Sequence, residues 1–119
     1  MAKSIEQVAQ ENPELLPFGW MVEGMDGLGD IGGSAWHTNR DLREQVQHAV
    51  RFLLERAAPR ESGDFNRRQG SYGLKHTAEK WAGAYISNGA LIAAALALGY
   101  EARRFPGSPN CSFNMDVTE

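Results

Sequence analysis

His76 and Glu79 are a pair whose types and spacing could do chemistry, because they stand three positions apart in a segment with helical periodicity. Residues at i and i+3 are neighbours on a helix, so the pair can share a proton or hold a metal ion. The sequence has no second His-x-x-Glu and no His-x₃-His to complete a metal site. We therefore predict no metal and no cofactor. An enzyme that uses His76 and Glu79 is the third of three hypotheses.

A glycine-rich segment, Gly27-Leu-Gly29-Asp-Ile-Gly32, matches the GxGxxG pattern of dinucleotide-binding loops. Such a site needs a strand before the motif and a helix that opens within it. Only the short run 20–22 precedes the motif, and Asp26 and Asp30 would place negative charge beside a phosphate. The same aspartates lack the intermediate ligand of a calcium loop. We interpret the segment as a turn.

The single cysteine, Cys111, excludes an internal disulfide and every zinc site built from several cysteines. In the alternating segment 111–115 it shares one face with Phe113 and Met115, so we expect a buried, unreactive thiol. The sequence also has no G-x-S-x-G motif, no Walker loop and no pair of acids suited to a glycosidase or nuclease. These absences favour a protein that is not an enzyme.

The polar segment 58–70 is predicted to be a surface loop. Within it, Phe65 precedes Arg67 and Arg68, and an aromatic side chain beside arginines is typical of an interface anchor. The other arrangement, a mobile loop with Phe65 folded back onto the core, stays open. The candidate contact residues for a partner or a nucleic acid are Phe65, Arg67, Arg68, Lys75, Asn88, Arg103 and Arg104.

Four helices are predicted to position these residues. Each begins at a residue whose side chain can cap a helix: Ser4, Thr38, Ser71, and Ser87 or Asn88. Each ends before or at a proline or glycine: Pro13, Pro59, Gly83 and Gly99. The last helix, 89–98, is apolar on every side, which places it in the middle of the fold.

The tail alternates apolar and polar residues and predicts a β-hairpin of 100–105 and 111–115, joined by 106–110. The predicted class is mainly α (α+β), with a helix-turn-helix-like pair and a C-terminal β-hairpin. We expect a single domain over 1–119. It consists of an N-terminal helix with a Gly/aromatic-rich, loop-rich arm (1–36), a helical core (37–99) and the hairpin (100–119).

The order of elements over 38–117 is that of winged-helix proteins, whose last helix enters the major groove. That helix carries no Arg, Lys, Gln or Asn after Asn88, so any nucleic-acid binding would use phosphate contacts. The chain has a net charge of −3, divided between −5 in residues 1–35 and +2 in the remainder. A winged-helix-like nucleic-acid-binding protein is therefore the second hypothesis.

The first hypothesis is a small non-enzymatic binding or regulatory protein that docks on a protein or nucleoprotein partner. Inhibitors and adaptors, such as those of mobile elements, have this profile. No apolar run approaches the roughly 18–20 residues that span a membrane, and the start of the chain turns acidic where a signal peptide would be apolar. We expect a cytoplasmic protein without membrane contact, either a monomer or a homo-oligomer.

Overall fold

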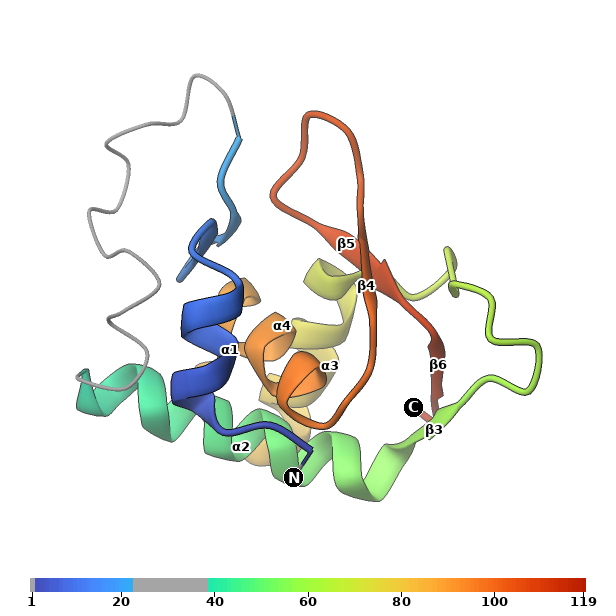
Figure 1. Ribbon diagram of the computed structural model, residues 1–119. Coiled ribbons are helices and arrows are strands. Elements are labelled where there is room, and N and C mark those ends of the chain that lie inside the picture. Colours follow the sequence, from blue (N-terminus) through green and yellow to red (C-terminus); the bar gives the residue numbers. More distant parts are fainter. Residues whose placement is uncertain (1, 23–38) are drawn as a thin grey trace.

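The computed structural model describes residues 2–22 and 39–119 (Figure 1). In these residues four helices surround or form the core, and three small antiparallel strand pairs lie at its edges. The mainly α, α+β prediction is confirmed. The glycine-rich motif at 27–32 and most of the predicted arm fall outside the described residues. No helix in the described ranges is long and apolar enough to cross a membrane.

Helix α1 (Ile5–Glu11) begins as its sequence predicts, since the Ser4 hydroxyl accepts a hydrogen bond from the backbone N–H of Gln7 at 3.1 Å. After it, β1 (Leu15–Leu16) and β2 (Gly19–Trp20) form a short antiparallel pair, where the sequence indicated irregular structure. Leucine and tryptophan are buried in this pair. The small hairpin therefore covers the core with apolar side chains.

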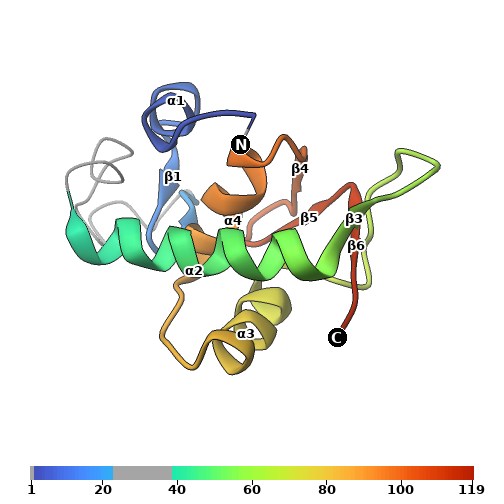
Figure 2. The ribbon, with the colours of Figure 1, turned by 90° about the horizontal axis from the view of Figure 1, so that it is seen from below.

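Helix α2 (Arg40–Arg56) is capped by Asn39, whose side chain accepts from the N–H of Leu42 at 3.1 Å. The predicted cap, Thr38, lies outside the described residues. The helix ends before Pro59, because β3 (Ala57–Pro59) pairs with the C-terminal part of the chain. Figure 2 shows α2 lying across α4, with α1 and α3 on opposite sides of it.

Helix α3 (Ser71–Ala82) begins one residue earlier than predicted, with Gly70 at the cap position that the sequence assigned to Ser71. Ser71 is wholly buried, and its hydroxyl accepts a hydrogen bond from the N–H of Cys111 at 3.1 Å. The prediction of Ser71 as the cap was wrong because this hydroxyl serves the C-terminal hairpin instead.

Helix α4 (Asn88–Ala97) occupies the centre of the molecule, as its all-round apolar sequence predicts. Ser87 caps it by accepting from the N–H of Ala90 at 3.1 Å, and Gly99 follows it with a φ of +96°. Its start packs against the end of β1 and the residue after it, where Gly89 donates its N–H to the carbonyl oxygen of Pro17 at 2.9 Å. Only a glycine allows this approach.

The predicted hairpin is confirmed by β4 (Ala102–Arg104) and β5 (Cys111–Phe113). The alternation continues beyond its predicted end at Met115 into β6 (Met115–Val117), which pairs antiparallel with β3. Cys111 is buried as expected, and burial raises the pKa of its thiol to about 11. A thiol in that state is a poor nucleophile at neutral pH.

Candidate functional site

The structure brings together four of the residues that the sequence selected. Phe65 is half-buried, and the guanidinium carbon of Arg103 lies 5.1 Å from the centroid of its ring. Arg67 and Arg68 follow on the same loop and are exposed. We call these four residues the Phe65 surface. Phe65 thus has an intermediate position, partly covered by the hairpin and partly open to solvent.

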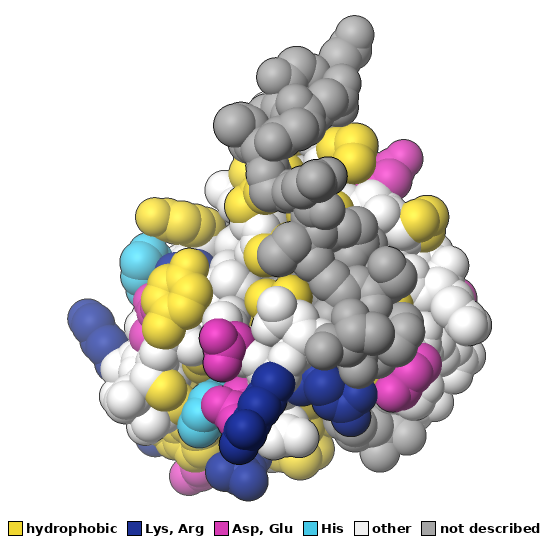
Figure 3. Space-filling model, turned by 90° about the vertical axis from the view of Figure 1, so that its left-hand side faces the viewer, with side chains coloured by type: hydrophobic (Ala, Val, Ile, Leu, Met, Phe, Trp, Pro, Cys, Tyr) yellow, Lys and Arg dark blue, Asp and Glu magenta, His cyan; other side chains and the backbone are white. Residues whose placement is uncertain are grey.

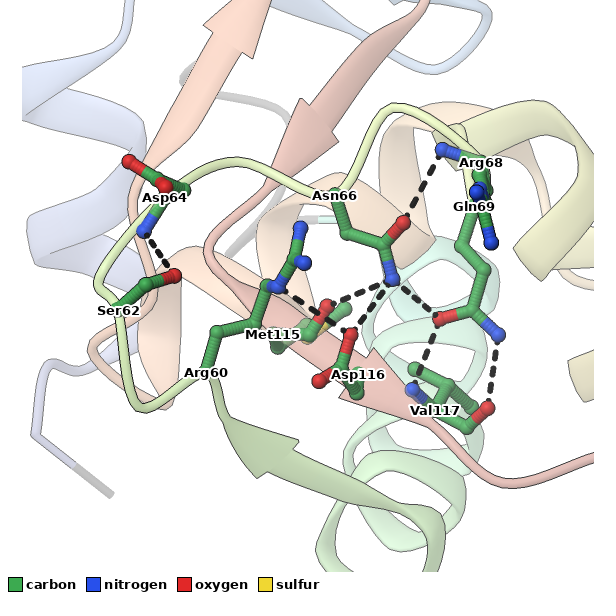
Figure 4. A network of polar contacts seen from close by, with 9 residues as sticks. All are labelled: Arg60, Ser62, Asp64, Asn66, Arg68, Gln69, Met115, Asp116 and Val117. Carbon is green, nitrogen blue, oxygen red and sulfur yellow. Dashed lines mark hydrogen bonds and ion pairs between the residues drawn. The ribbon is translucent and has the colours of Figure 1, made fainter.

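Asn66 fixes the loop behind this surface (Figure 4). It is only 9% exposed, and its side-chain amide donates to Oδ1 of Asp116 at 2.8 Å and to Oε1 of Gln69 at 3.1 Å. The side-chain oxygen Oδ1 of Asn66 accepts a hydrogen bond from the backbone N–H of Arg68 at 3.0 Å. The backbone N–H of Asn66 donates to the carbonyl oxygen of Phe113 at 2.8 Å. The loop is therefore bonded to β5 and β6, not free in solvent.

Gln69 continues this attachment by bonding the main chain of β6 as a neighbouring strand would. Its Nε2 donates to the carbonyl of Val117 at 2.7 Å, and its Oε1 accepts from the N–H of Val117 at 2.9 Å. Two buried main-chain groups are satisfied without a partner strand. The side chain of one loop residue thus extends the sheet and closes its edge.

An open groove of about 690 Å³ runs between this loop and the C-terminal strand. Arg60, Arg67 and Arg68 line it together with Asp116 and Glu119. Arg60 is paired with Asp116 at 3.5 Å. Neither Arg67 nor Arg68 has an ion pair within residues 2–22 and 39–119. The groove therefore offers two free guanidinium groups in a setting that also contains carboxylates.

Arg104 and Asn88 lie elsewhere and hold the N-terminal segment onto the hairpin. Arg104 pairs with Glu14 and stacks over the ring of Trp20, 5.2 Å from its centroid. Asn88 is buried and donates to the carbonyl of Phe18 at 3.0 Å and to Oδ1 of Asn110 at 2.9 Å. Both side chains are committed to contacts within the chain.

Lys75 is also buried, in contrast to the exposed position that a phosphate contact requires. Its ammonium lies 3.4 Å from a carboxylate oxygen of Glu79 and 4.8 Å from the centroid of the Tyr85 ring. The ammonium is thereby satisfied within the chain. Lys75 does not join the Phe65 surface.

His76 and Glu79 meet as their spacing predicts, with Nδ1 of His76 3.0 Å from Oε1 of Glu79. Burial raises the pKa of Glu79, but the hydrogen bond from the Ile86 N–H and the charge of Lys75 outweigh it, so the pKa is lowered overall. The carboxylate therefore links α3 to the start of α4. No group of three or more potential metal ligands gathers anywhere in the described part of the chain.

Sequence reasoning missed Asn66, Gln69 and Asp116, which decide the shape of the site. One pattern in the sequence could have indicated part of this arrangement. The alternation of apolar and polar residues continues through Met115, Asp116 and Val117, so it predicts a longer strand whose backbone groups need a partner. Nothing in the polar segment 58–70 indicates that an amide side chain would supply that partner.

Charges of both signs are interspersed elsewhere on the molecule. Figure 3 shows one such face, where Lys and Arg side chains lie beside Asp and Glu, with hydrophobic side chains among them. A mixed surface of this kind is ordinary for a globular domain and provides no long-range field of one sign.

Searches against protein-family models, curated proteins and solved structures found no match to this chain.

Proposed function

We propose that this chain is a non-enzymatic binding protein that docks on a protein partner through the Phe65 surface. One observation carries the proposal: a loop without regular secondary structure is hydrogen-bonded to β6 through the buried Asn66, and it carries two exposed arginines and Phe65, whose ring lies beside Arg103 of β4. A surface fixed before binding loses little conformational entropy when a partner arrives. Aromatic and arginine side chains are also enriched at protein–protein interfaces.

The chemistry of the surface favours a partner that combines an apolar group with carboxylates. Phe65 offers ring area, and the free guanidinium groups of Arg67 and Arg68 match carboxylates in a two-bond geometry. Asp116 and Glu119 line the same groove and repel negative charge, so the groove accommodates one or two separate carboxylates more readily than a continuous row of phosphates. This favours an acidic protein segment over nucleic acid.

The experiment places a photoreactive phenylalanine analogue at position 65 and irradiates the protein in a native lysate. The same analogue at Tyr72, an aromatic side chain that is more exposed than the half-buried Phe65, serves as the control. We expect a discrete, nuclease-resistant adduct from position 65 that disappears when Arg67 and Arg68 are both changed to glutamate. The control position should give no such adduct.

Two results would overturn the proposal. Identical adducts from both positions, or adducts that persist in the charge-reversed variant, would show that the Phe65 surface does not select a partner. An adduct that nuclease digests back to the size of the chain alone would instead support the phosphate-contact alternative. In that case binding should weaken steeply with salt.

A further inference from the structure

A second hollow lies between α1 and α2, away from the Phe65 surface. Figures 1 and 2 both place α1 and the 60–69 loop on opposite sides of the molecule. The hollow has a volume of about 230 Å³ and is lined by Ile5 of α1 and by Arg43, Val46, Gln47, Val50 and Arg51 of α2. This volume lies below the roughly 300–1,000 Å³ of typical ligand pockets, so the hollow suits only a ligand smaller than a typical drug molecule.

The lining divides into an apolar row and a polar row. Val46 and Val50 are four residues apart, so they stack on one face of α2 and form the apolar floor together with Ile5. Arg43, Gln47 and Arg51 repeat with the same spacing along the neighbouring face and form the rim. An apolar floor with a few polar groups at one edge is the usual composition of a small-molecule site.

The two arginines of the rim differ in their ion pairing. Arg43 lies 3.4 Å from a carboxylate oxygen of Glu6. Arg51 is exposed and has no ion pair in the described ranges. The hollow thus combines apolar area with one free guanidinium group. That combination matches a single carboxylate attached to an apolar body.

We propose that the α1–α2 hollow binds a small amphipathic carboxylate. Its apolar body lies on Ile5, Val46 and Val50, and its carboxylate accepts two hydrogen bonds from Arg51. This site is independent of the Phe65 surface, because the two share no residue. Failure of either proposal therefore leaves the other intact.

The test is a titration of the ¹⁵N-labelled chain with octanoate, followed by amide chemical shifts. Octanol and octylammonium serve as probes with a similar apolar chain and no negative charge. We expect octanoate to shift the amides of Ile5, Val50 and Arg51 saturably, and the other two probes to bind more weakly. Arg51→Gln should raise the dissociation constant of octanoate about fivefold or more.

Arg67→Gln is the matched control, since it removes an unpaired arginine from the Phe65 surface and should leave octanoate binding unchanged. Arg51 is exposed, so its replacement should preserve the amide spectrum away from the hollow. Equal binding of octanoate and octylammonium would overturn the proposal. So would shifts located elsewhere, or an unchanged dissociation constant in Arg51→Gln.

Discussion

The start of α4 and the loop 60–69 are both firmly placed, but by different kinds of contact. At the start of α4 the backbone of Gly89 packs directly against the backbone of Leu16 and Pro17, and the helix beyond it is built of small and apolar residues. In the loop, Asn66 and Gln69 hold the chain by hydrogen bonds to β5 and β6, with little apolar area. Close packing of backbone against backbone leaves no room for a side chain at position 89. The hydrogen bonds attach the loop to the strands on one side only, so Arg67 and Arg68 stay exposed and Phe65 stays half-exposed.

The largest effect is expected at the apolar end, for Gly89→Ala. A Cβ atom on Gly89 would lie 1.9 Å from the carbonyl oxygen of Leu16, so β1 must move away. We expect the free energy of unfolding to fall by about 3 kcal/mol, the upper range for overpacking. Urea unfolding followed by circular dichroism measures it.

Gly73→Ala provides the control for that experiment. Gly73 is exposed within α3, and nothing lies within 4 Å of a Cβ built on it. Alanine is the better helix former, so this variant should gain about 0.5–1 kcal/mol. A similar loss in both variants would show that the close contact with Leu16 is not what limits position 89.

The next effect is expected in the polar region, for Asn66→Ala. This change removes the donor to Asp116 and the acceptor for the Arg68 N–H, and it leaves buried groups unpaired. We expect a loss of about 2 kcal/mol, together with weaker crosslinking from position 65. Arg67→Ala should change stability by less than about 0.5 kcal/mol, because this side chain is exposed. Equal effects of the two changes would refute the anchoring role of Asn66.

A smaller effect, about 1 kcal/mol at neutral pH, is expected for Glu79→Gln. The pKa of Glu79 is lowered from 4.5 on folding, so its stabilising contribution is present above that value. The contribution is lost as the pH falls through the lower pKa of the folded state. Thermal unfolding between pH 7 and pH 3 should therefore decline less steeply in the variant. A parallel pH dependence in both proteins would contradict this assignment.

The smallest change is expected for Cys111 when the protein is treated with a thiol reagent. Burial raises the pKa of this thiol to about 11, so little thiolate forms at pH 8. We expect no modification of the folded protein over minutes and complete modification in denaturant. Rapid reaction under native conditions would show that the hairpin side of the core opens readily.

The difference between the two regions also explains which features the sequence could predict. The cap at Ser4, the central position of 89–98 and the hairpin arise from local patterns, and the structure confirms them. The β3–β6 pair joins residues nearly 60 positions apart, so no local pattern indicates it. The role of Ser71 was predicted wrongly and that of Gln69 was missed, because their side chains accept hydrogen bonds from backbone N–H groups that are 40 or more positions away in the sequence.

The candidate contact residues were selected by residue type, and the structure places some of them at the surface and others in the interior. Phe65, Arg67 and Arg68 lie on one loop, and Arg103 of β4 lies over the ring of Phe65. Lys75 and Asn88 were selected for the same chemistry but are buried, because nearby carboxylate, aromatic and carbonyl groups satisfy them within the chain. A charge or amide in the sequence does not show where its partner lies.

The most direct test of the account is the exchange rate of individual backbone amides in the loop 60–69 and in β6, to which the loop is bonded. If the loop is fixed before any partner binds, the N–H groups of Asn66 and Val117 should be protected to a degree similar to β5, because each donates a hydrogen bond. Glu61, at the exposed tip, should exchange rapidly. Exchange of Asn66 and Val117 at the rate of Glu61 would contradict a preformed docking surface.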